Sequence, residues 1–112
     1  MEIKTRKPGN HIAILDIEGE IDIYNSGELK KAVQELLANG VINIVFNLAK
    51  VPYIDSSGIG ALIASLTQLK RAKGSMKIFN AFEAVKKVFE LTKMTSFFEI
   101  YTSEEDALRT IK

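Results

Sequence analysis

The sequence of 112 residues contains no cysteine and no tryptophan, and its one histidine is His11. Without cysteine the chain cannot form a disulfide, a thiolate metal site or a thiol nucleophile. A lone histidine in a predicted N-terminal hairpin supplies neither a carboxylate–histidine metal cluster nor the base of a serine hydrolase. A glycine-rich phosphate loop with a lysine is also missing. We therefore expect a chain that folds and works without a metal or a cofactor.

Long apolar runs and an excess of charge are missing as well. No apolar run approaches the ~18 residues of a membrane span, and residues 1–6 lack the apolar core of a signal peptide, so we expect a cytoplasmic protein with no membrane span. The formal net charge is +1, which provides no overall attraction to nucleic acid or to a membrane surface. Length and a 46% share of hydrophobic residues predict one globular domain over residues 1–112.

The middle of the chain is locally basic. Its cations are Lys70, Arg71, Lys73, Lys77, Lys86, Lys87 and Lys93. Glu83 and Glu90 interrupt this section and no aromatic side chains alternate with the lysines, so a solvated face is favoured over a nucleic-acid site.

Apolar periodicity predicts alternating strands and helices. Strands are expected over residues 3–6, 11–17, 41–48, 76–79 and 97–101, with helices beginning near residues 25, 56, 82 and 103, and residues 21–23 are compatible with one more strand. The nearly continuous apolar run 41–48 indicates a central strand, and we expect Phe46 and Leu62 in the core. The fold class is α/β: a mixed sheet, mostly parallel with an N-terminal hairpin, covered by about four helices.

The most informative segment is residues 51–60, VPYIDSSGIG, where a strand stops and a long amphipathic helix begins. Free backbone N–H groups and the positive end of the helix dipole favour negative charge at such a place, so a phosphate on Ser56 would be tolerated. Aspartate and serine are also the usual N-cap residues, and the same segment suits a plain helix cap. In that interpretation Ser57 serves chiefly as the cap.

Three segments together resemble the STAS domain of bacterial anti-sigma factor antagonists. They are residues 18–22 (EGEID), Asn47-Leu48 and residues 51–60, and the resemblance covers nearly the whole chain. Many members of this family have aspartate where this chain has Asn47. That position precedes the turn, so the departure affects little.

The resemblance implies a partner and a switch. In family members of this kind an anti-sigma factor that is also a serine kinase phosphorylates the serine after the motif aspartate, which here is Ser56, and a serine phosphatase is implied as its counterpart. The implied partner surface comprises Asp22, Asp55, Ser56, Ser57 and Gly58. We expect Asp22 and Asp55 to serve recognition or phosphorylation rather than folding.

Two other function classes compete with this interpretation. A serine hydrolase is disfavoured because Ile54 stands where the nucleophile elbow requires glycine, and because His11 lies in another part of the chain. A non-switching STAS subunit of a transporter or of a stress-signalling assembly is the stronger rival, since it would use residues 55–58 only as a helix cap. The sequence by itself leaves this rival open.

Overall fold

The computed structural model describes residues 1–111, which form five strands and four helices. In chain order the elements are β1 (Glu2–Gly9), β2 (Ile12–Glu18), α1 (Ser26–Ala38), β3 (Asn43–Lys50), α2 (Ser56–Arg71), β4 (Ser75–Phe79), α3 (Glu83–Leu91), β5 (Glu99–Tyr101) and α4 (Glu104–Arg109). The alternation that periodicity predicted is confirmed, as is the α/β fold class with its antiparallel N-terminal hairpin.

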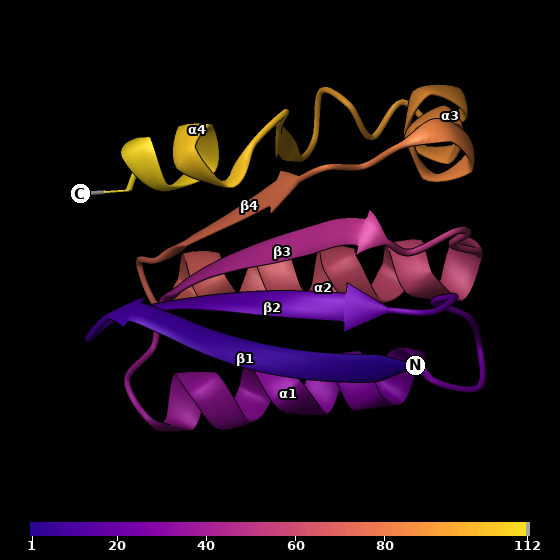
Figure 1. Cartoon of the computed structure of the whole chain (residues 1–112). Coiled ribbons are helices and arrows are strands. Elements are labelled where there is room, and N and C mark those ends of the chain that lie inside the picture. The colour runs from indigo at the N-terminus through magenta and orange to yellow at the C-terminus, as the bar shows by residue number, and fades with distance from the viewer. Residues whose placement is uncertain (112) are drawn as a thin grey trace.

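The strands form one sheet in the order β1-β2-β3-β4-β5, so β3 is the central strand as its apolar sequence predicted. β1 pairs antiparallel with β2, whereas β2, β3, β4 and β5 are parallel to one another. Figure 1 shows β2 and β3 pointing to the same side of the molecule, where α3 also lies. We call the end at which Glu18, Lys50 and Phe79 close their strands the carboxyl edge.

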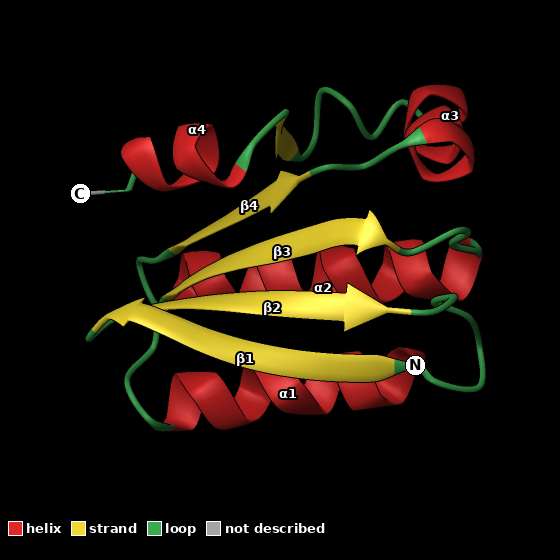
Figure 2. Ribbon diagram, in the orientation of Figure 1, coloured by secondary structure: helices red, strands yellow, loops and turns green. Residues whose placement is uncertain are grey.

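The two faces of the sheet are covered unequally. The main core lies on the face covered by α1, α2 and α3, and it contains Phe46, Leu62 and Phe89, each 0% exposed. Figure 2 shows α1 and α2 side by side behind the first three strands. On the opposite face a smaller cluster joins Val45 and Phe79 to Ala107 of α4. The prediction that Phe46 and Leu62 are buried is confirmed.

Residues 21–23 form no strand, only a single parallel bridge between Ile21 and Ile54. The chain turns away at once because the Asp22 carboxylate accepts the amides of Tyr24 and Asn25. At the end of α2 the left-handed residue is Lys73, with φ 63°. Gly74 follows it and is needed for close packing, since a Cβ there would collide with the Ile42 carbonyl.

Candidate functional site

The N-terminus of α2 is the centre of the candidate site. Asp55 is the N-cap residue, and its side chain accepts a hydrogen bond of 3.0 Å from the Gly58 amide. Its carbonyl accepts the Ile59 amide at 3.0 Å and so starts the helical ladder. Ser56 is therefore the first residue of the helix and Ser57 the second. The cap predicted for Ser57 is wrong, because Asp55 already occupies the capping position.

Two backbone donors remain available at this helix start. Within the described part of the chain, the amides of Ser56 and Ser57 have no hydrogen-bond partner. These unpaired N–H groups lie at the positive end of the helix dipole, which is the arrangement that favours an anion. The Ser56 residue is exposed and Ser57 is half-buried. A phosphate carried by Ser56 would thus lie in water beside free donors.

A short two-strand contact holds the turn in place. The Ile21 amide donates to the Tyr53 carbonyl at 3.1 Å, and the Asp55 amide donates to the Ile21 carbonyl at 3.1 Å. Ile21 and Ile54 are both 0% exposed beneath this contact. Because Asp22 follows Ile21 directly, the structure brings the Asp22 loop alongside residues 55–57. The expected proximity of these two segments at the carboxyl edge is therefore present.

Gly58 supports the turn from below. A Cβ at this position would collide with Ile54 Cγ1 and lie 2.9 Å from Ile21 Cγ2. The residue is buried, so a partner docking on this surface would not reach it directly. The structure thus places Gly58 under the site, where it lets α2 begin against the Ile21–Ile54 bridge.

Asp22 has a structural task that the sequence did not suggest. Its Oδ1 accepts the Tyr24 amide at 2.9 Å and the Asn25 amide at 3.2 Å, and its own amide donates to Asn25 Oδ1 at 2.9 Å. The expectation that Asp22 and Asp55 act apart from folding needs correction, because each carboxylate organises backbone amides. Both remain half-exposed and available to a partner.

Sequence reasoning missed a group of apolar side chains around Ser56. Tyr24 is 93% exposed, Ile23 67% and Tyr53 47%. They lie in the two loops that the Ile21–Ile54 bridge joins. Ile23 ends a segment that is compatible with a strand, whereas Tyr24 and Tyr53 fit neither a helical nor a strand period, and that misfit was the available signal. Exposed aromatic residues beside a polar centre are typical of a protein-binding surface.

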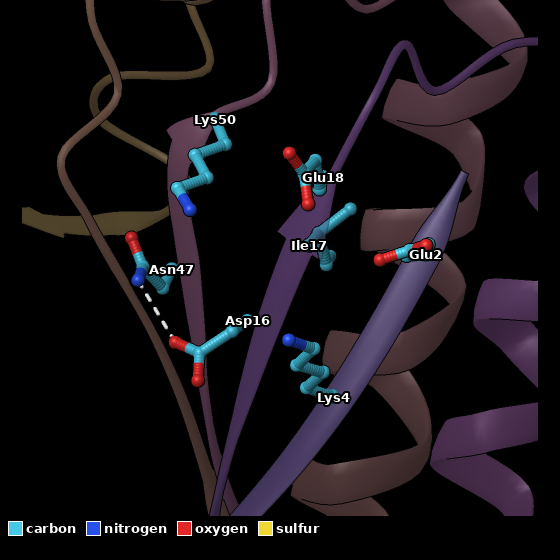
Figure 3. Close-up of a pocket in the computed structure, with 7 residues that line it drawn as sticks. All are labelled: Glu2, Lys4, Asp16, Ile17, Glu18, Asn47 and Lys50. Atoms are coloured by element: carbon cyan, nitrogen blue, oxygen red, sulfur yellow. Dashed lines mark hydrogen bonds between the residues drawn. The ribbon is translucent and has the colours of Figure 1, made fainter.

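A polar hollow on the sheet face that carries α4 is a separate feature. Figure 3 shows Asp16, Asn47, Lys4 and Lys50 around it, with Asn47 Nδ2 donating to Asp16 Oδ1 at 2.8 Å. Arg6 bridges Asp16 and Glu104, which ties β1 and β2 to α4. The hydrogen bond from Arg6 holds the pKa of Asp16 below its usual value, against the opposing effect of burial. Its carboxylate is already satisfied, so this hollow is a salt-bridged sheet face.

Three observations concern parts of residues 1–111 other than the Ser56 turn. No group of three or more histidine, cysteine or carboxylate side chains there is arranged to hold a metal ion. His11 contacts the Gly40 carbonyl at 3.0 Å beside the start of β2, at the end of the sheet away from Ser56. No helix in this part of the chain has both the length and the apolar character to cross a membrane.

Comparison with known proteins gives a consistent result. The sequence profile of the STAS domain matches residues 2–107. An anti-sigma-B factor antagonist of Listeria monocytogenes is 29% identical over 104 residues, covering 93% of this chain and 90% of that protein. An anti-sigma factor antagonist from Mycobacterium paratuberculosis has a similar fold, with a TM-score of 0.84, 22% identity and coverage of 98% and 94%. The phosphorylated form of the Bacillus cell fate determinant SpoIIAA superposes with a TM-score of 0.74 at 19% identity, covering 96% and 98% of the two chains.

Proposed function

This chain belongs to the STAS domain family as an anti-sigma factor antagonist, and we propose that phosphorylation of Ser56 switches its binding to an anti-sigma factor off. Proteins of this class are regulators rather than enzymes. The observation that carries the proposal is the exposed Ser56 hydroxyl on the first residue of α2, beside unpaired backbone donors. A phosphorylated form of one similarly folded antagonist supports it. We take residues 1–112 as one such domain.

The fold can accept the modification. A phosphoserine carries about −1.5 to −2 charge, and at a helix N-terminus the dipole offsets roughly 0.3–2 kcal/mol of its cost. The first turn of α2 contains no acidic residue after the Asp55 cap, while Lys70 and Arg71 complete the dipole at the other end. Since Asp55 bonds the Gly58 amide, the Ser56 and Ser57 amides stay available to the phosphate. Modification should therefore leave α2 intact.

A docked partner would respond differently. Asp22 and Asp55 already make this surface acidic, so a partner that binds it needs complementary positive charge or donors placed against them. A phosphate on Ser56 would add negative charge and bulk to this surface. The complex would then have to remove the water bound to the phosphate or make room for it in the interface. A loss of about 2.8 kcal/mol would correspond to a hundredfold weaker complex. Binding could therefore end without any unfolding.

The partner class follows from the family, and its chemistry is part of the proposal. We assign the kinase activity to the anti-sigma factor itself, because the modified hydroxyl lies on the surface that it would bind. A serine phosphatase would restore binding. Both enzymes and the sigma factor would meet this chain in the cytoplasm, where transcription takes place.

The test uses purified parent protein, the anti-sigma factor of the same organism and ATP. The variants are Ser56→Ala, Ser57→Ala and Ser56→Asp, and Ser96→Ala is the matched control because Ser96 is another exposed serine whose hydroxyl bonds locally to the Lys93 carbonyl. Mass spectrometry maps the phosphate, and calorimetric titration measures the complex. We expect phosphate on the parent, Ser57→Ala and Ser96→Ala proteins but not on Ser56→Ala. Ser56→Asp should bind at least tenfold more weakly than the parent.

Two results would contradict the proposal. One is phosphate at Ser57 with Ser56 unmodified. The other is undiminished binding after full phosphorylation of Ser56. In the second case the turn would be a plain helix cap, as in the non-switching alternative.

A further inference from the structure

One exposed aromatic residue at the carboxyl edge, Phe82, lies far from Ser56 in the sequence. Phe82 is 54% exposed and precedes α3, three positions after the end of β4. Together with Ile23, Tyr24 and Tyr53 it places four of the six large exposed apolar side chains in the described chain on this one edge. Of the remaining two, Leu91 is the last residue of α3 and Phe97 follows that helix. Exposed apolar residues are thus gathered where the parallel strands end.

The backbone at the start of α3 is strained, and Phe82 is an unfavourable residue for the position that it occupies. Glu83 has φ 45°, in the left-handed region that non-glycine residues rarely adopt, and Asn80 has φ 58°, in the same region, which asparagine tolerates. Phe82 is the N-cap of α3 and provides no side-chain cap bond, although serine, threonine, aspartate or asparagine would do so. Strained, locally unfavourable residues of this kind concentrate at functional sites.

Surface hollows lie on both sides of the Phe82 ring. One of about 430 Å³ separates it from Val51 and Pro52, which lead directly into Tyr53 and the Ser56 turn. The other, of about 540 Å³, lies toward Phe89, Ile100 and Tyr101. Phe82 therefore stands as a ridge between two depressions, and the first depression lies between it and the segment that leads into the Ser56 turn.

The area buried in an ordinary protein complex indicates how far a partner docked over Ser56 would extend. A standard protein complex buries about 800 Å² on each partner, which as a disc is about 32 Å across. The whole molecule measures 33 × 28 × 23 Å along its principal axes. A standard footprint is therefore about as wide as the molecule, so one partner docked over Ser56 has room to contact Phe82 at the same edge.

We propose that Phe82 is an anchor residue for the same anti-sigma factor that binds over Ser56, with its ring inserted in an apolar pocket of that partner. This inference rests on the proposed function. It explains the phenylalanine at a capping position directly before the strained Glu83. Aromatic anchor residues commonly dominate the affinity of an interface.

The experiment exploits the poor cap. Phe82→Ser removes the ring and supplies a favourable N-cap, so this variant should melt at the same temperature as the parent or higher. Its affinity for the purified anti-sigma factor should nevertheless fall at least tenfold. Leu91→Ala is the matched control, because Leu91 is 74% exposed and lies at the opposite end of α3 from Phe82, and this variant should bind within twofold of the parent.

The outcomes separate this inference from the proposed function. If Phe82→Ser binds within twofold of the parent while Ser56→Asp binds poorly, Phe82 is no anchor and the switch stands. If Ser56→Asp binds like the parent while Phe82→Ser does not, the anchor stands and the proposed switch fails. Sedimentation of the parent alone gives a third check: a dimer that Phe82→Ser dissociates would assign the ridge to a second copy and overturn the inference.

Discussion

The cap of α2 gives the most direct test of how the site is built. Asp55 and Ser57 lie two residues apart, and both are residue types that cap helices. In the structure only Asp55 does so, through its 3.0 Å bond with the Gly58 amide. The side chain of Ser57 makes no hydrogen bond among the described residues. Replacing each with alanine therefore separates the two candidates.

The substitutions should change the free energy of unfolding by measurably different amounts. Loss of an aspartate N-cap costs about 1 kcal/mol, within a range of roughly 0.5–2 kcal/mol. Ser57→Ala removes no bond and improves helix propensity slightly, so its effect should stay within about 0.5 kcal/mol. Asp55→Asn retains the capping oxygen but loses the charge, and should cost only the dipole contribution of about 0.3–1 kcal/mol.

Urea unfolding followed by circular dichroism provides the measurement. With a slope of about 1–2 kcal/mol per molar urea, Asp55→Ala should lower the midpoint by about 0.5–1 M. Ser57→Ala should leave it almost unchanged, and Asp55→Asn should fall between the two. A larger loss for Ser57→Ala than for Asp55→Ala would refute the assignment of the cap. It would also remove the argument that the Ser57 amide is free for a phosphate.

Two further predictions concern the core and the open sheet face. Leu62→Ala and Phe46→Ala should each lower the free energy of unfolding by roughly 2–5 kcal/mol, because both side chains are 0% exposed and their truncation leaves cavities. Lys30→Ala, at an exposed position, is the control. Equal urea midpoints for all three variants would contradict the assignment of Leu62 and Phe46 to the core. The bond from Arg6 lowers the pKa of Asp16, so the carboxylate stabilises the fold above the unfolded pKa near 4 and loses this contribution as pH falls through the native value. Asp16→Asn should thus have a lower free energy of unfolding than the parent at pH 7, and this difference should shrink below pH 4. Urea titrations that give the same difference at every pH would show that the ion pair contributes nothing.

The sequence by itself determined the kind and order of the elements. Helical and strand periods are local patterns, since each can be recognised within a window of a few turns or a few strand residues. For that reason the central position of β3, the burial of Phe46 and Leu62 and the start of α2 near Ser56 were all predictable. The resemblance of residues 51–60 to one family added the function.

Only the tertiary structure decided how the site is assembled. The cap belongs to Asp55, Gly58 is buried and Asp22 turns its loop, because Ile21 pairs with Ile54 across more than thirty residues of chain. No local pattern contains that contact, and capping preferences alone fit Asp55 and Ser57 about equally well. Phe82 lies beside Pro52 for the same reason: parallel strands bring the ends of distant segments to one edge. Contacts between remote residues, rather than propensity, placed these side chains together.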